Sequence, residues 1–285
     1  MLIDLDKKNC LAIVIGSGSV KCAAGLGMYK VMQREGIQAD LAVGCSGGSV
    51  IAASIALGYQ VEEIENMLLT IWKRELMSKY YFRSLLRMIL PRWFGFNERF
   101  GLIDDRPVMK SMQNVFGGIT FENTLIPLYI MATDLWNGEK VVLHQGELAN
   151  AIRASIAAPA VFRPWSVDGR LLIDGAMSDP LPVDVAIREG AEVIMAMGFE
   201  SPYHTQISSI LSIVLQMSSI SNNNLLRSSF AFYNLAHHAE IIPIMPKFKK
   251  HIDFADTHLI PYIIEEGERA TEQHLPYLKR LFGVK

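Results

Sequence analysis

The stretch that most constrains the fold runs from Asp40 to Leu57 and reads D-LAVG-CSGGS-VIAASIAL. A short apolar run ends at Gly44-Cys45-Ser46-Gly47-Gly48, and small apolar residues at helical spacing follow it, which predicts a strand, a tight turn and a helix. Glycines around a serine are typical of an elbow whose turn is strained and whose helix packs close to the strand. The helix N-terminus behind the turn favours negative charge on a bound carbonyl oxygen. Ser46 is therefore the candidate nucleophile, with Gly44, Gly47 and Gly48 as the elbow glycines.

A second unit of the same kind precedes the first. The apolar run Leu11–Ile15 leads into the loop Gly16-Ser17-Gly18-Ser19-Val20-Lys21, and a helical pattern continues to Gly36. Two consecutive units of this type predict neighbouring parallel strands whose turns lie at the same sheet edge. The loop lacks the last glycine of a dinucleotide fingerprint. Its backbone is suited to an oxyanion hole over Ser46, and a purely structural turn is the alternative.

Several blocks of the chain together resemble the patatin-like phospholipase family over roughly residues 10 to 200. These blocks are the glycine loop with its basic residue, the G-x-S-x-G motif about 25 residues later, Ala132–Leu135, Ala151–Ser155 with Pro159, Phe162 and Pro164, and Asp174-Gly175-Ala176. The glycine loop departs from the family, because Ser17, Ser19 and Cys22 stand where glycines are usual. The resemblance implies an oxyanion hole at Gly18, Ser19 and Val20.

Asp174 is the second candidate catalytic residue. Asp-Gly is a common turn dipeptide and alone indicates only a turn. However, the apolar run Leu171–Ile173 places the carboxylate at a strand end, where the catalytic groups of α/β sheets gather. The resemblance implies a Ser46–Asp174 dyad, in which a buried carboxylate accepts the serine proton. The competing mechanism is a Ser-His-Asp triad, but no recognisable triad block contains any of the histidines, His144, His204, His237, His238, His251, His258 and His274.

The remaining polar candidates have supporting roles. Asp134 and Arg153 are expected either to pair and brace the site or to be solvated. The three cysteines, Cys10, Cys22 and Cys45, have no metal-ligand spacing and indicate a reducing compartment, with Cys45 packed beneath the elbow. We expect no cofactor and no metal.

The apolar patterns predict a three-layer α/β/α sandwich with a largely parallel central sheet, and a single domain over residues 1–285. Within that domain, residues 73–105 form a basic aromatic cap or membrane-facing insertion, and residues 205–285 form a mostly helical part. We expect Ile207–Ile220, which mixes apolar and serine residues, to pack internally. The predicted strands also include Pro127–Thr133, Lys140–His144 and Glu192–Met197, and the predicted helices include Gln60–Met77, Asp105–Phe116, Ala149–Ser155, Val183–Glu189, Leu225–Ala239 and Ile263–Phe282.

Charge and hydropathy restrict partners and location. A net charge of −2 argues against a general nucleic-acid binder. The chain contains no run of eighteen apolar residues, and the apolar run near its start is too short for a signal peptide, so we expect a cytoplasmic protein. The segment Lys73–Arg99 interleaves seven basic side chains with aromatic residues and leucines. It fits peripheral contact with the inner face of a membrane, and equally a helical cap with a solvated basic face.

The expected function is hydrolysis of carboxylic ester bonds in phospholipids or other lipid acyl esters, through an acyl-enzyme on Ser46. The alternatives are an esterase or thioesterase acting on soluble acyl substrates and a non-catalytic, membrane-associated binding protein. The sequence indicates no particular oligomeric state.

Overall fold

The computed structural model describes residues 10–72, 93, 95, 97–203, 206, 207, 209–236, 239–253 and 256–283. Most of the basic aromatic segment Lys73–Arg99 lies outside these residues, and so does the end of the helix predicted over Gln60–Met77. His204, His237 and His238 also lie outside them.

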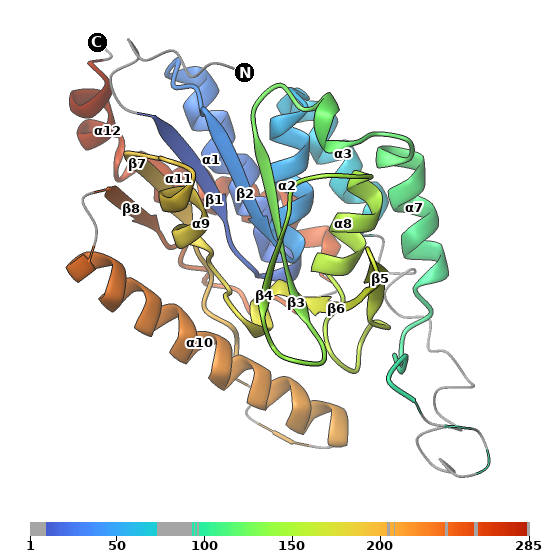
Figure 1. The fold of residues 1–285 in the computed structure, drawn as a ribbon. Helices are drawn as coiled ribbons and strands as arrows, with labels where there is room; N and C mark the ends of the chain where they lie inside the picture. The colour runs from blue at the N-terminus through green and yellow to red at the C-terminus, as the bar shows by residue number, and fades with distance from the viewer. Residues whose placement is uncertain are drawn as a thin grey trace.

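The described residues form one eight-stranded sheet in the order β5-β6-β3-β2-β1-β7-β8, with β4 paired to β3 (Figure 1). β1, β2, β3, β7 and β8 are parallel, while β4, β5 and β6 are antiparallel to their neighbours. The strands are β1 (Leu11–Ile15), β2 (Leu41–Cys45), β3 (Leu128–Asp134), β4 (Lys140–Leu143), β5 (Trp165–Val167), β6 (Arg170–Asp174), β7 (Val193–Met197) and β8 (Glu240–Ile244). The central strands are apolar because both of their faces are covered.

The register along β3 brings two strand ends together. β2 pairs with the first half of β3 and ends at Cys45, which lies opposite Met131. β6 pairs with the second half and ends at Asp174, which lies opposite Ala132. β4 occupies the other edge of β3 across both halves, so β2 and β6 share one edge and meet end to end. The residue after Cys45 is therefore directed toward Asp174.

Helices cover both faces of the sheet (Figure 1). One face packs against α1, α2, α3, α7, α8, α11 and α12, and the other packs against α9 and α10. The bounds are α1 (Ala24–Arg34), α2 (Gly47–Ala56), α3 (Val61–Ile71), α7 (Arg106–Phe116), α8 (Leu148–Ser155), α9 (Val183–Arg188), α10 (Ile210–Ala236), α11 (Ile260–Glu272) and α12 (Leu275–Phe282). The 3-10 turns are η1 (Ser19–Ala23), η2 (Phe121–Asn123), η3 (Gly175–Met177) and η4 (Thr257–Leu259). The predicted three-layer α/β/α sandwich with a largely parallel sheet is confirmed.

The C-terminal part differs from expectation at one place. We expected Ile207–Ile220 to pack internally, but Ile207, Ile210, Ile213, Met217 and Ile220 are all exposed. Most of these residues belong to the first half of α10, which passes over the carboxyl end of the sheet instead of burying an apolar face against it. The helix predicted over Leu225–Ala239 overlaps only the second half of α10, whose first half is also helical. Periodicity alone cannot tell which side of a helix a neighbouring element covers.

Candidate active site

Ser46 lies at a strained elbow between β2 and α2. Its φ of 53° and ψ of −129° lie outside the regions that residues with a side chain normally adopt. The glycines permit close backbone contact: a Cβ atom added to Gly44 would lie 2.5 Å from the Ser49 Cα, and one added to Gly48 would lie 2.2 Å from the Ile15 carbonyl oxygen. The elbow therefore needs glycine for space at these two positions.

Three hydrogen bonds fix the elbow from either side. The Ser46 amide donates to the Ser155 hydroxyl at the end of α8, with an N···O distance of 2.8 Å. The Ser49 hydroxyl donates to the Ser46 carbonyl at 2.5 Å, and the Ser49 amide donates to the same oxygen at 2.9 Å. In the sequence, Ser155 stands out only as the end of the block Ala151–Ser155. Its contact with Ser46 could not be inferred from a separation of more than one hundred residues.

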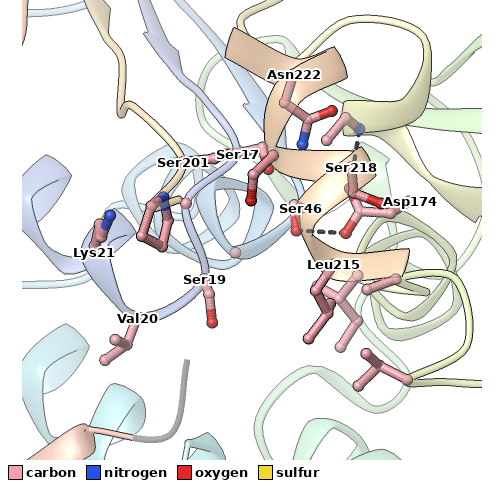
Figure 2. A pocket seen from close by; sticks show the side chains of 18 of the residues that line it. Ser17, Ser19, Val20, Lys21, Ser46, Asp174, Ser201, Leu215, Ser218 and Asn222 are labelled. Atoms are coloured by element: carbon pink, nitrogen blue, oxygen red, sulfur yellow. Dashed lines mark hydrogen bonds between the residues drawn. The ribbon is translucent and has the colours of Figure 1, made fainter. Parts of the chain in front are cut away.

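The Ser46 hydroxyl donates to Asp174 Oδ2 at 2.7 Å (Figure 2). The other carboxylate oxygen, Oδ1, accepts from the Ala176 amide at 2.9 Å. The Thr133 hydroxyl donates to the Asp174 carbonyl at 3.0 Å, which fixes the end of β6 against β3. Both Ser46 and Asp174 are buried. A serine hydroxyl paired with an oriented carboxylate can transfer its proton to that carboxylate as it attacks a carbonyl.

Burial raises the pKa of the Asp174 carboxyl to about 6, and the hydrogen bonds from Ser46 and Ala176 oppose that rise. A carboxylate with a raised pKa is a stronger base than an ordinary aspartate and is still mostly ionised at neutral pH.

The glycine loop after β1 packs directly against the elbow. A Cβ atom added to Gly47 would lie 2.6 Å from the Ser19 carbonyl oxygen, so the two turns are in backbone contact. Gly18, Ser19 and Val20, the expected oxyanion-hole residues, all line the pocket that contains Ser46. Ser19 has a φ of 52°, a second strained position beside the same pocket. Lys21 donates from Nζ to the Glu200 carbonyl at 3.0 Å, and burial lowers the pKa of its ammonium group.

The pocket has a volume of about 280 Å³ and two chemically different sides. In Figure 2 the polar side chains Ser17, Ser218 and Asn222 lie on one side of Ser46, while Val20 and Leu215 lie on the other together with the Ser19 hydroxyl. The apolar lining also includes Trp72, Leu102, Ile103, Ile156, Val161, Phe162 and Ile252. The Asn222 side-chain oxygen is buried and has no hydrogen-bond partner among the described residues. The pocket is suited to a ligand with one apolar and one polar part.

The buried thiols fill space near the site. Cys45 donates from Sγ to the Asp179 carbonyl at 3.4 Å, and Cys22 donates to the Gly16 carbonyl at 3.2 Å. Burial raises the pKa of both thiols, which disfavours the reactive thiolate. The prediction that Cys45 packs beneath the elbow is confirmed.

The described histidines do not contribute to the pocket lining, although His251 Nε2 lies 3.0 Å from Oδ1 of the pocket residue Asp253. His144, His251 and His258 are exposed, and neither they nor His274 line the pocket. The part of the chain that the structure describes also contains no cluster of three or more His, Cys, Asp or Glu side chains that could hold a metal ion. Within the same residues, no helix has the length and apolar character needed to cross a bilayer.

Asp134 and Arg153 do not pair with each other. Asp134 accepts from Arg170 Nε at 2.8 Å. Arg153 is fully buried, donates to Asp105 and to the Arg163 carbonyl, and stacks over the Trp165 ring at 4.9 Å. The expected pair is wrong because each charge has a partner from a different element. The Asp105–Arg153 pair was missed because Asp105 resembled only a helix-start residue in sequence.

A serine at a strand-to-helix elbow, paired with a carboxylate over a three-layer α/β/α sheet, places this chain in the class of α/β proteins organised around an elbow serine. The family model for patatin-like phospholipases matches residues 13–187, more than half of the chain. The chain therefore belongs to the patatin-like phospholipase family.

Known proteins match about two thirds of this chain. The chain is 30% identical over 187 residues to an uncharacterized NTE family protein of Mycobacterium tuberculosis, an alignment that covers 66% of this chain and 48% of that protein. It is 27% identical over 202 residues to the neuropathy target esterase sws of Drosophila melanogaster, covering 70% and 14% respectively. The chain thus spans about half the length of the mycobacterial relative. A crystal structure of VipD from Legionella pneumophila aligns with a TM-score of 0.49 and 13% identity, covering 94% of this chain and 66% of that one.

Proposed function

We propose that this chain is a serine acyl hydrolase that cleaves carboxylic ester bonds of phospholipids or other lipid acyl esters, with Ser46 as nucleophile and Asp174 as general base. The observation that carries the proposal is the 2.7 Å hydrogen bond from the Ser46 hydroxyl to Asp174 Oδ2 within a buried pocket. Membership of the patatin-like phospholipase family supports the same class of reaction.

The proposed reaction has two halves. In the first, Ser46 Oγ attacks the ester carbonyl carbon and its proton passes to Asp174 Oδ2. The resulting oxyanion is stabilised by backbone amides of Gly18, Ser19 and Val20. Collapse of the tetrahedral intermediate breaks the bond to the alcohol, which takes the proton from Asp174 and leaves an acyl group on Ser46. In the second half, water attacks the acyl carbon, Asp174 accepts a proton from that water, and the carboxylic acid departs as Ser46 regains its proton.

The two sides of the pocket support an amphiphilic substrate. An acyl chain fits the side that contains Val20 and Leu215, and a polar alcohol fits the side that contains Ser218 and Asn222. The buried Asn222 oxygen can accept a hydrogen bond from a hydroxyl group of that alcohol. An ester bond at the boundary between these two sides would lie over Ser46.

Covalent labelling tests the proposal. The native chain, Ser46→Ala and Asp174→Asn are exposed to a long-chain fluorophosphonate in the presence of lipid vesicles, and intact mass is measured. We expect one adduct on the native chain, none on Ser46→Ala and much slower labelling of Asp174→Asn. A folded native chain that forms no adduct would contradict the proposal and favour a non-catalytic lipid-binding role. A labelled chain that hydrolyses soluble esters or thioesters but no vesicle lipid would restrict the activity to soluble acyl substrates.

A further inference from the structure

The first half of α10 exposes an apolar stripe to solvent. Ile210, Ile213, Met217 and Ile220 are between 43% and 65% exposed. Their spacing of three, four and three residues places them on one side of the helix. An exposed cluster of large apolar side chains at helical spacing is unusual for a surface helix and marks an interaction surface. We call these four residues the α10 stripe.

The opposite side of the same helix lines the pocket. Leu215, Ser218, Ser219 and Asn222 all contribute to the pocket wall. At 100° per residue they centre roughly opposite the α10 stripe, and Figure 2 shows Leu215, Ser218 and Asn222 directed toward the pocket around Ser46. The usual amphipathic pattern is therefore reversed, since the solvent side is more apolar than much of the inner side. The helix α10 therefore lies between the pocket and the surface to which the α10 stripe is exposed.

The second half of α10 anchors the helix in place. Leu226 and Phe230 pack against the sheet face that α9 also covers. Asn223 accepts from the Ser201 amide at 2.8 Å and donates to the Ser201 carbonyl at 3.0 Å. The α10 stripe is thus held outward by packing further along the helix.

Charge around the stripe favours a lipid surface. Residues 201–236 contain a single charged side chain, Arg227, whereas one residue in five is charged over the whole chain. Arg227 pairs with the exposed Glu200 at 3.7 Å, and α10 itself contributes no acidic side chain that would repel anionic headgroups. Interfacial helices bury an apolar face at the boundary of the acyl chains, which is the environment this stripe matches.

A lysine run borders the same pocket. Lys247, Lys249 and Lys250 are exposed in the loop that follows β8, and the loop continues directly into Ile252 and Asp253, which line the pocket. The Lys249 amide donates to the Tyr262 hydroxyl at 3.0 Å, and Lys250 lies over the Tyr262 ring at 4.7 Å, so the run is held against α11. Lysines at this end of the pocket add attraction to the headgroups of anionic lipid.

We propose that the α10 stripe docks on an anionic lipid surface, with the lysine run contacting headgroups, so that a lipid enters the Ser46 pocket beneath α10 from that surface. The part of this inference that concerns hydrolysis of the lipid rests on the proposed function. Docking on the lipid surface requires no catalysis.

The test is co-sedimentation with vesicles, performed on the full chain carrying Ser46→Ala so that lipid is not consumed. Phosphatidylcholine vesicles with phosphatidylglycerol are compared with phosphatidylcholine alone. In this background, Ile213→Ser with Met217→Ser changes the stripe, and Lys247→Glu with Lys249→Glu changes the lysine run. Leu125→Ser is the matched control. Leu125 is 66% exposed, but it precedes β3 and therefore lies at the amino end of the parallel strands, whereas the pocket lies at their carboxyl end. Circular dichroism verifies that each variant is folded.

We expect the stripe variant to bind vesicles at least ten-fold more weakly and the control to bind as the parent does. The lysine variant should bind vesicles that contain phosphatidylglycerol more weakly than the parent does, with little change on vesicles of phosphatidylcholine alone. Equal binding by the stripe variant and its parent overturns the proposal. Light scattering tests whether the stripe instead binds a second copy of the chain. If the parent is dimeric, and the stripe variant is monomeric but binds vesicles normally, the stripe is a dimer interface and the docking proposal is overturned.

The two proposals can fail separately. A native chain that sediments with vesicles but is never labelled by the fluorophosphonate contradicts the proposed function and leaves the docking surface standing. A labelled chain whose stripe variant sediments normally contradicts docking alone.

Discussion

The amide of Ser46 donates to the hydroxyl of Ser155 at 2.8 Å, and this bond joins the elbow of β2 and α2 to the end of α8. Ser155 is fully buried. A backbone with φ of 53° at a serine persists only when its surroundings hold it there. Ser155 therefore acts as a positioning residue for Ser46.

We expect Ser155→Ala to lower kcat with little change in KM, because the Ser46 amide loses its partner and the strained turn relaxes. Leaving a buried donor unsatisfied should also cost about 1–3 kcal/mol in the free energy of unfolding. The matched control is Ser54→Ala, since Ser54 is equally buried but bonds only the Val50 carbonyl of its own helix. Steady-state kinetics and urea unfolding measure both effects. A similar loss of kcat in the two variants would contradict a specific role for Ser155.

The second prediction concerns the pH dependence of hydrolysis. Asp174 must be ionised to accept the Ser46 proton, and burial raises the pKa of its carboxyl to about 6. We expect kcat/KM to rise with pH, to level off above about pH 6, and to fall about ten-fold per pH unit below it. A profile measured on a soluble ester between pH 4 and 8 tests this. An acidic limb near pH 4 would show that Asp174 is not desolvated as the structure indicates.

The third prediction concerns stability at the same residue. Because the folded state raises the pKa of Asp174 from 3.8 to about 6, ionisation destabilises the native protein as pH rises through that interval. Asp174→Asn has no such charge, so above pH 6 it should be more stable than the native chain by about 3 kcal/mol. This advantage should vanish below about pH 4.

Asp134→Asn is a control for the Asp174→Asn variant, because its stability should change in the opposite direction. Its hydrogen bond from Arg170 holds the pKa of Asp134 below the ordinary value, so the ionised form stabilises the fold above pH 4. We expect Asp134→Asn to lose stability at pH 8, while Asp174→Asn gains it. Urea unfolding at pH 4 and pH 8 measures both variants, and shifts of the same sign would contradict the assigned pKa directions.

The sequence was sufficient for the parts of the site that local patterns encode. The elbow at Ser46 and the strand ending at Asp174 follow from apolar runs interrupted by glycine, and the strand-loop-helix order predicts parallel neighbours. What sequence could not give is the register along β3, in which Cys45 lies opposite Met131 and Asp174 opposite Ala132. That register depends on which strand pairs with which edge, a tertiary property.

The same reason explains the errors. Arg153 and Asp134 have other partners because long-range packing, and not sequence proximity, determines ion pairs. Ile213 and Met217 follow a regular helical pattern, but the pattern does not reveal that the side chains on the opposite side line a pocket. Periodicity identifies a face of the helix, and only the structure identifies what covers it.

The last prediction concerns the buried charge behind the pocket. Arg153 is fully buried and bonds Asp105, and its guanidinium lies 5.6 Å from the ring centre of Phe162, a pocket residue. Burial favours the neutral form of Asp105, but Arg163 and Arg153 outweigh it and hold the pKa of its carboxyl below the ordinary value.

Arg153→Met should therefore lower the free energy of unfolding by about 1.5–3 kcal/mol at pH 8, because Asp105 loses a fully buried charged hydrogen-bond partner and keeps only the partly exposed Arg163. Arg170→Met removes two ion pairs, to Asp134 and Glu139, in which the arginine is 41% exposed, so it should lower the free energy of unfolding far less. Urea unfolding of the two variants at pH 8 makes the comparison. At pH 4 the loss in Arg153→Met should shrink, because Asp105 without Arg153 takes up a proton and no longer buries a charge. Equal losses in the two variants would mean that Arg153 contributes packing alone.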